Sequence, residues 1–270
     1  GSEMCIRDSN IVIAVVFTCC YAYQLFFLAV PFTKKQEPHK PEVLHRFAIL
    51  ICARNEEAVI ADLIQSIRHQ TYDQSLLTVF VMADNCTDAT ADIARREGAV
   101  VYTRFNREKV GKGYALEQLL LHIEEDYPKV YDGFFVFDAD NVADEQFLAR
   151  MNDAFCAGAQ VCKGAMRAKN PYDSWLSGCY GLYFTLFDTF FSRARMSCGL
   201  SSKLVGTGFA VHRAVLERFG GWNTSTIAED AEFAAQCAAN GVRVCFVPGA
   251  LTYDCLLYTS PSPRDRTRSR

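Results

Sequence analysis

The sequence lacks the patterns that mark several common classes of protein. Its 12 cysteines form no CxxC pair and do not alternate with histidines at the spacing of a zinc site. The net charge is −3, so no basic excess predicts a nucleic-acid partner. Internal repeats and low-complexity stretches are absent, and 270 residues is too long for a small secreted domain held by disulfides. Zinc-finger, nucleic-acid-binding and repeat proteins are therefore disfavoured.

The two ends of the chain are interpreted as translated adapter DNA. A DNA sequence that resembles a sequencing adapter encodes residues 255–265, and its reverse complement encodes residues 1–8. Unrelated coding sequence would not be expected to produce this pairing. We therefore expect residues 1–9 and 254–270 to be adapter-derived, and they do not enter the fold prediction.

The segment of residues 11–32 is almost wholly apolar and has the length that a bilayer demands. A transmembrane helix is predicted over residues 10–33, followed by a polar linker at 34–45. Lys34 and Lys35 come directly after the apolar run, and cytosolic flanks of membrane helices are rich in such residues. The downstream domain is therefore expected on the cytosolic face of the cell membrane. A signal peptide or a buried helix is the alternative, but no small-residue cleavage site follows.

From residue 46 onward, short apolar runs alternate with amphipathic stretches, which is typical of an α/β domain. Buried, largely parallel strands are predicted at 47–52, 77–83, 99–103, 134–137 and 161–166. Helices are predicted between them, at 57–70, 87–97, 113–125 and 145–157, with Thr87 and Asp144 as N-cap residues. The pattern predicts a doubly wound, mostly parallel sheet over residues 46–253.

Residues 174–196 form a long aromatic segment that ends on Arg193 and Arg195. A helix buried in the same domain is the favoured interpretation, because Asp188 and the glycines weaken a lipid-facing assignment. The alternative is a helix that lies along the membrane interface.

Polar residues follow several predicted strands, where the ligands of a doubly wound sheet gather. Each group alone is also typical of a turn or a helix cap. The sharpest is Asp138-Ala139-Asp140, because two carboxylates at a strand end can both address one hard divalent cation. Mg²⁺ or Mn²⁺ there would neutralise a leaving diphosphate. An Asx turn without metal is the alternative.

The order of motifs resembles the family 2 glycosyltransferases, among them cellulose-synthase-like and poly-N-acetylglucosamine synthase-like membrane enzymes. The resemblance covers residues 47–253 and rests on ICARNEE, ADNCTD, GKGYAL, FDADN, GTGFAVHR followed by GGW, and AEDAEF. It implies the GT-A fold. It also implies inverting transfer from a UDP-sugar, of the glucose or N-acetylglucosamine type, to a glycan or lipid-linked acceptor. The motifs do not choose between the two sugars.

The resemblance implies roles for the donor-binding residues. Asn55 and Glu56 would line the nucleoside pocket, and Asp84 would accept a hydrogen bond from N3 of uracil. Lys112 would lie near the base or the diphosphate, between two glycines that let backbone approach; a flexible start of the helix is the alternative. Asp138 would contact the ribose or a metal-bound water, and Asp140 the metal itself. The floor under donor sugar and acceptor would be Gly206, Thr207 and Gly208, with a β-bulge as the alternative.

The catalytic base is predicted to be Asp230, with Glu229 as an orienting neighbour. Asp230 begins an amphipathic run, and the start of a helix favours an ionised carboxylate. A capping acid on an ordinary helix is the alternative. His212 is interpreted as structural, and Trp222 fits either an acceptor sugar or the core.

Two other functions compete with glycosyl transfer. A sugar nucleotidylyltransferase would carry a glycine-rich loop after its first strand, but the loop here, CARNEE, contains no glycine. A non-catalytic, nucleotide-sugar-binding membrane scaffold would not need Asp138, Asp140, Glu229 and Asp230 together.

Overall fold

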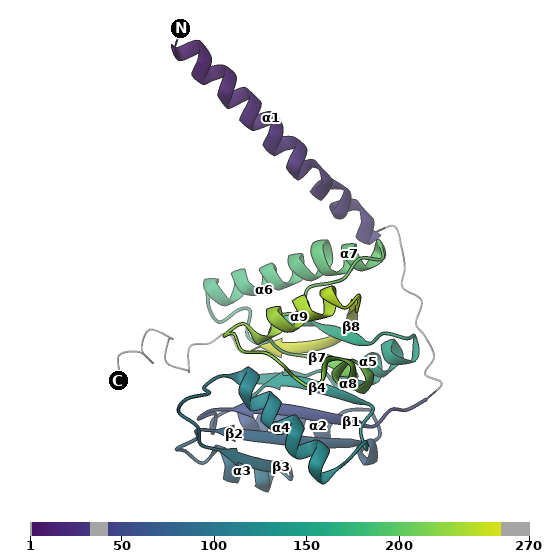
Figure 1. The fold of residues 1–270 in the computed structure, drawn as a ribbon. Helices are drawn as coiled ribbons and strands as arrows, with labels where there is room; N and C mark the ends of the chain where they lie inside the picture. Colours follow the sequence, from purple (N-terminus) through teal and green to yellow (C-terminus); the bar gives the residue numbers. More distant parts are fainter. Residues whose placement is uncertain (1, 33–42, 255–270) are drawn as a thin grey trace.

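The structure, a computed structural model, describes residues 2–32 and 43–254 (Figure 1). It begins with the helix α1 (Ser2–Ala29) and the 3-10 turn η1 (Val30–Phe32). The segment Ser9–Phe32 is long and apolar enough to cross a membrane, as predicted for residues 10–33. Most of the predicted linker and the residues 255–270 lie outside the described residues.

The described residues form one eight-stranded sheet in the order β3-β2-β1-β4-β7-β6-β8-β5. The strands are β1 (Phe47–Ala53), β2 (Leu77–Asp84), β3 (Val100–Arg104), β4 (Gly133–Asp138), β5 (Asn141–Ala143), β6 (Val161–Ala168), β7 (Phe209–His212) and β8 (Val244–Asp254). Strands β1 to β4 are parallel, and β7 is antiparallel to its neighbours β4 and β6. The predicted, mostly parallel α/β sheet is confirmed.

Helices cover both faces of the sheet, so side chains of either parity along β1 are buried. One face packs against α2 (Ile60–Arg68), α3 (Thr90–Arg96) and α5 (Phe147–Cys156). The other packs against α4 (Lys112–Asp126), α8 (Arg213–Phe219) and α9 (Glu229–Ala239). Phe47 and Ile49 point to the first layer, and Ala48 and Leu50 to the second. Burial of each large apolar side chain stabilises the fold by about 1.5–3 kcal/mol. The central strands are therefore stabilised by packing on both of their faces.

The five predicted strands are all present, whereas the pattern does not predict β5, β7 and β8. Strands β5 and β7 have only 3 and 4 residues. In β8, Pro248 and Gly249 interrupt the apolar run, and the pairing with β6 shifts register between Gly164 and Ala165. Short or irregular strands of this kind leave little periodic signal.

The two predicted N-caps are wrong by two residues each. Helix α3 begins after Ala89 and α5 after Gln146. The amide of Thr87 instead donates to Asn55 Oδ1 at 2.8 Å, and the carboxylate of Asp144 accepts from the Gln146 amide at 3.1 Å. Asp144 thus stabilises the turn before α5, which is the usual competitor of a capping role, whereas Thr87 joins the loop before α3 to the loop after β1.

The aromatic segment is helical but not buried, which corrects the predicted buried helix. It comprises α6 (Trp175–Phe187), a π-helical turn η3 (Asp188–Arg193) and α7 (Ala194–Ser197). Large apolar side chains of α6 are exposed, while Ser177 and Asp188 are buried. The segment lies across the side of the domain from which α1 projects (Figure 1).

Candidate functional site

Most of the predicted site residues meet at one edge of the sheet. The carboxyl ends of β1, β2 and β4 lie there, with Cys52 beside Asp138 and Ala53 beside Ala83. Strand β7 runs the opposite way, so the segment before it, 206–208, reaches the same edge. The strand order reverses between β1 and β4, and such a switch point forms a crevice in open α/β sheets.

The loops after β1 and β2 are joined by hydrogen bonds. Asn55 adopts a left-handed conformation with φ 57°, and its Oδ1 accepts from the amide of Thr87 at 2.8 Å. The amide of Glu56 donates to Thr90 Oγ1 at 2.8 Å. These bonds place the two predicted nucleoside-pocket residues beside the carboxyl end of β2.

Asp84 is held by a buried cation that the sequence analysis does not identify. Arg104 Nη1 donates to Asp84 Oδ1 at 2.6 Å, and both side chains are buried. Asn85 Nδ2 donates to the same oxygen at 3.0 Å. Arg104 Nε also donates to Gln118 of α4 at 2.8 Å. The only signal in the sequence is an arginine directly after the apolar run of β3.

Lys112 is the centre of the site. Its Nζ donates to Asp138 Oδ1 at 2.6 Å and to the carbonyl of Gly206 at 3.0 Å, and lies 3.4 Å from Glu229 Oε1. Burial lowers the pKa of Lys112, but the carboxylates of Asp138 and Glu229 outweigh this and raise it overall. Lys112 is therefore a charged ammonium that joins α4, β4, α9 and the segment before β7.

A neutral thiol lies beside this cluster. Burial is the largest cause that raises the pKa of Cys52, Lys112 opposes it and the neighbouring carboxylates add to it; together they raise the pKa to about 12. Cys52 is therefore protonated at physiological pH and adds no charge to the site.

Gly113 is needed for close packing at the start of α4. A Cβ at this position would lie 2.5 Å from Thr224 Oγ1 and 3.4 Å from Cβ of Glu229. Preceding it, Gly111 has φ 143°. Gly113 is therefore required by close packing, and Gly111 by its positive φ.

The segment 206–208 forms a tight loop before β7. Gly206 and Gly208 have φ of 55° and 64°, and a Cβ on Gly208 would lie 2.8 Å from Thr252 Cγ2. Thr207 is buried, and its Oγ1 accepts from the amide of Asp138 at 2.9 Å. The loop precedes the strand, so it is not a bulge within it, and it fixes the end of β4.

Asp230 lies in the first turn of α9, as predicted. Its Oδ2 accepts a short hydrogen bond from the amide of Gly206, and its Oδ1 accepts from the Ala231 amide at 2.7 Å. Gly206 thus contacts Lys112 through its carbonyl and Asp230 through its amide. Glu229 is buried and faces Lys112, so the two acids of this turn are separately held.

Of the two carboxylates of the predicted metal site, Asp138 is the last residue of β4 and Asp140 lies on the turn between β4 and β5. Asp138 is partly exposed and Asp140 exposed. Next to them, Asn141 Oδ1 is a buried oxygen for which the described residues provide no hydrogen-bond partner. Within the same residues, no cluster of three or more His, Cys, Asp or Glu side chains has metal-binding geometry. An all-oxygen set with few carboxylates fits Mg²⁺ or Mn²⁺, which usually complete their coordination with water and phosphate.

A profile of the family described as "Glycosyltransferase like family 2" matches residues 45–270. The chain belongs to this family. It is 28% identical to a probable glycosyltransferase, YdaM, of Bacillus subtilis, over 86% of this chain and 55% of that protein. It is 30% identical to the beta-monoglucosyldiacylglycerol synthase of a Nostoc species, over 68% of this chain and 39% of that protein. The chain thus spans about half, or less, of the length of these relatives.

Solved glycosyltransferases share the fold of this family 2 chain. The mannosyltransferase PcManGT of Pyrobaculum calidifontis, solved with GDP-mannose and Mn²⁺, superposes with a TM-score of 0.68. The identity is 20%, over 92% of this chain and 69% of that one. The glucosyl-3-phosphoglycerate synthase of Mycobacterium tuberculosis, solved with Mn²⁺, UDP and phosphoglyceric acid, has a TM-score of 0.52. Its identity is 19%, over 83% of this chain and 74% of that one. The predicted GT-A fold is confirmed.

Two side chains of the family 2 chain lie away from the crevice. His212 Nδ1 accepts from the amide of Ala214 and caps α8, at the opposite end of β7, as the structural interpretation predicts. Trp222 is buried, and its ring stacks on Phe233 with centroids 4.3 Å apart. Trp222 is therefore part of the core and not a platform for an acceptor sugar.

Lys163 is a further buried cation that the sequence analysis does not identify. It lies on β6, and its Nζ donates to the carbonyl of Thr207 at 2.7 Å. Burial, the largest cause, lowers its pKa to about 8, and the carboxylates of Asp188 and Asp138 oppose this only in part. Lys163 therefore stabilises the 206–208 loop through its hydrogen bond to the Thr207 carbonyl.

We predict a pH-dependent contribution of Lys163 to stability. Its pKa is about 8 in the folded chain against an ordinary value of 10.5, so between these pH values the unfolded chain binds more protons. Stability from this group therefore rises as the pH increases through that range. Urea unfolding of the domain is followed in detergent from pH 7.5 to 10. Over this range the free energy of unfolding of wild type should increase relative to that of Lys163→Met. Parallel pH curves for the two proteins would contradict the assignment.

Proposed function

We propose that the chain is the catalytic domain of an inverting glycosyltransferase, residues 46–253, anchored by the helix over residues 10–33. It transfers a sugar from a UDP-sugar to a glycan or lipid-linked acceptor at the cytosolic face of the membrane. The observation that carries the proposal is the convergence of Asp138, Lys112, Gly206 and Asp230 in one hydrogen-bonded cluster at the edge of the sheet. Membership of the glycosyltransferase family supports the reaction class.

The donor nucleotide would lie along the carboxyl ends of β1 and β2. Asn55 and Glu56 form one wall, and Asp84 offers a fixed carboxylate whose Oδ1 is held by Arg104. A carboxylate accepts the N3–H of uracil but faces only a lone pair on N3 of cytosine. The glucosyl-3-phosphoglycerate synthase binds UDP while PcManGT binds GDP-mannose, so the base preference rests on Asp84 and not on the fold.

Asp138 and Asp140 are proposed to hold Mg²⁺ or Mn²⁺. The bound cation would stabilise the negative charge of the leaving diphosphate. Both solved relatives contain Mn²⁺, which supports a divalent cation in this fold. Lys112 bonds only one oxygen of Asp138 and adds a second positive charge at the point where the diphosphate would lie.

Asp230 is proposed as the general base. It takes the proton of the acceptor hydroxyl, whose oxygen then bonds to the anomeric carbon as the bond to the UDP oxygen breaks. The electron pair of that bond leaves with UDP, and attack opposite to it inverts the configuration. The Gly206 amide holds Asp230 through Oδ2, and the start of α9 favours its ionised form. Glu229 orients the site indirectly, through its ion pair with Lys112.

We predict that UDP binding depends on the divalent cation and that Asp140→Ala removes this dependence. Calorimetry of the full chain in detergent should show tighter UDP binding with Mn²⁺ than with excess chelator. In Asp140→Ala the two conditions should give the same affinity. Asp92→Ala, which removes an exposed carboxylate that pairs with Arg95, serves as a control and should behave like wild type. Equal UDP affinity of wild type with and without Mn²⁺ would refute the metal site.

We predict that UDP competes for the donor site better than CDP. In CDP, N3 of cytosine is an acceptor and would face the Asp84 carboxylate without a hydrogen bond. The binding free energy of CDP should therefore be about 1–3 kcal/mol less favourable than that of UDP. Competition against a labelled UDP-sugar with wild-type protein measures this directly. Asp84→Asn is a poor substitute, because it leaves Arg104 as a buried, unpaired charge and would cost about 3–5 kcal/mol of stability. Equal inhibition by the two nucleotides would exclude this role of Asp84.

We predict that Asp230→Asn retains UDP and metal affinity but lowers turnover. Loss of a general base typically costs about 10²–10⁴-fold. The substitution keeps the shape and an acceptor oxygen for the Gly206 amide, so binding should persist. Product release from a UDP-sugar by the full enzyme gives turnover, and calorimetry gives binding. Near-normal turnover would move the base elsewhere, and a wild type that binds UDP-sugars without any turnover would favour a non-catalytic scaffold.

A further inference from the structure

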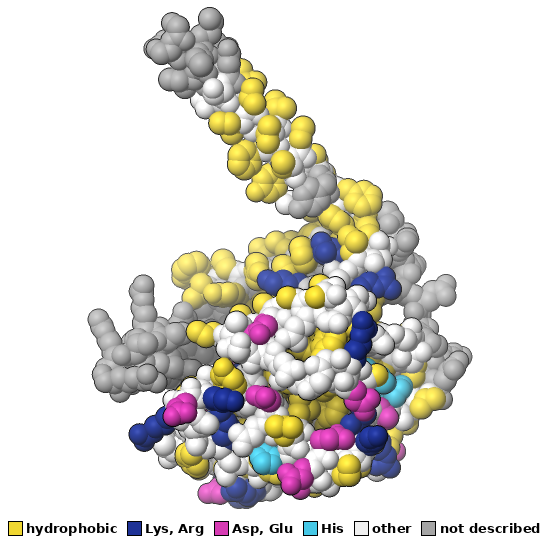
Figure 2. Space-filling view, in the orientation of Figure 1, with side chains coloured by type: hydrophobic (Ala, Val, Ile, Leu, Met, Phe, Trp, Pro, Cys, Tyr) yellow, Lys and Arg dark blue, Asp and Glu magenta, His cyan; other side chains and the backbone are white. Residues whose placement is uncertain are grey.

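Helix α6 presents an unusual set of side chains to the outside of the domain. Six large apolar or aromatic residues of the α6–η3 segment are exposed: Trp175, Tyr180, Leu182, Tyr183, Leu186 and Phe191. We call them the α6 face. Figure 2 shows apolar side chains along this helix, whereas the lower part of the same view is mixed with charge. A contiguous exposed apolar surface on a folded domain marks an interaction site.

The inner side of the same segment is polar. Ser177 is fully buried, and Asp188 and Ser192 are nearly so. Asp188 Oδ2 accepts from the amide of Met166 at 3.1 Å and from Arg167 Nη1 at 2.8 Å. A helix on the surface of a soluble protein has the opposite arrangement, with polar residues outside. The α6 face therefore suits an apolar surrounding and not water.

Cations lie under the aromatic rings at the edge of this face. The Arg195 guanidinium is 5.1 Å from the ring centroid of Phe191, and Lys203 Nζ is 5.5 Å from that of Phe187. Basic side chains are visible just below the apolar band in Figure 2. Aromatic rings with lysine and arginine beside them are typical of the layer where lipid headgroups meet acyl chains.

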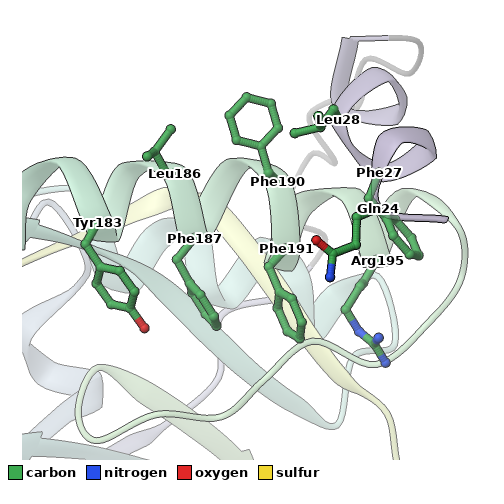
Figure 3. A pocket seen from close by; sticks show the side chains of 9 residues that line it. All are labelled: Gln24, Phe27, Leu28, Tyr183, Leu186, Phe187, Phe190, Phe191 and Arg195. Carbon is green, nitrogen blue, oxygen red and sulfur yellow. The ribbon is translucent and has the colours of Figure 1, made fainter. Parts of the chain in front are cut away.

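The α6 face is continuous with the candidate membrane helix. The rings of Phe32, at the end of η1, and Phe190 of η3 have centroids 6.2 Å apart. A groove of 490 Å³ lies between the two helices, and Figure 3 shows its lining side chains from both. Phe27 and Leu28 line it from α1, and Tyr183 and Leu186 from α6. The end of α1 and the α6 face are thus at the same level.

We propose that the α6 face lies in the interfacial layer of the bilayer that α1 crosses. The occupant of this surface is the lipid bilayer itself, because α1 enters lipid directly beside it and basic residues flank it. The domain then contacts the bilayer at two places, the end of α1 and the length of α6. This membrane contact does not depend on the reaction proposed above.

The two tryptophans of the chain allow a direct test. Trp175 is 80% exposed at the start of α6, whereas Trp222 is 2% exposed in the core. The full chain is reconstituted into vesicles of phosphatidylcholine and phosphatidylglycerol, with or without bromine on the acyl chains near the headgroup. Brominated lipid should quench the emission of Trp175 and not that of Trp222. Trp175→Phe should therefore show no bromine-dependent loss, and Trp222→Phe should keep it.

A matched pair of leucine variants tests the face as a whole. Leu182→Glu, on the α6 face, should reduce the quenching of Trp175, because a carboxylate resists insertion into lipid. Leu121→Glu places the same charge at an equally exposed leucine of α4 and should leave the quenching unchanged. Equal emission of the wild type in brominated and plain vesicles would overturn the proposal. Equal emission with a concentration-dependent blue shift of Trp175 would assign the face to a second copy of the chain instead.

Discussion

The candidate site depends on the ion pairs of one lysine. Lys112 contacts Asp138, Glu229 and the Gly206 carbonyl, which come from three segments far apart in the sequence. The site gathers Asp138, Glu229 and Asp230, and three carboxylates around one loop repel one another unless a cation lies among them. The lysine is largely buried, so its attraction to the carboxylates is less screened than at the surface. Lys112 therefore joins the segments that form the site and offsets the repulsion between its carboxylates.

The same geometry explains how the site can receive a diphosphate. Lys112 bonds Oδ1 of Asp138, while Asp140 is exposed on the adjacent turn. A metal–diphosphate pair carries both signs of charge. Its cation can interact with the carboxylates, and its phosphate oxygens with the ammonium of Lys112. The backbone of 206–208 stays fixed meanwhile, because Thr207 is bonded to Asp138 and to Lys163. In the proposed function, donor binding would therefore rearrange side-chain charges around a fixed backbone.

The sequence predicts the central strands well because β1, β2 and β4 are largely apolar on both faces. Strands β2 and β4 end on Asp84 and Asp138, and polar residues follow β1 directly after Ala53. The sequence misses β7 and β8, which are short or irregular. It also misses Arg104 and Lys163, since a buried cation has no periodic signature and its partner is distant in sequence. The motif order locates Asp138 and Asp230, but their link through Gly206 and Lys112 appears only in three dimensions.

Helix α6 shows why composition alone could not assign its surroundings. Aromatic residues favour the core of a protein and the membrane interface alike, and only the placement of Ser177 and Asp188 on the inner side separates the two. Asp188 also faces Lys163 across a small cavity that includes Val205, next to the 206–208 loop. The α6–η3 segment thus presents aromatic side chains outward, while Asp188 on its inner side lies near the 206–208 loop. Seating α6 on a bilayer would fix the distance between the membrane surface and Asp230, which an acceptor held in that membrane requires.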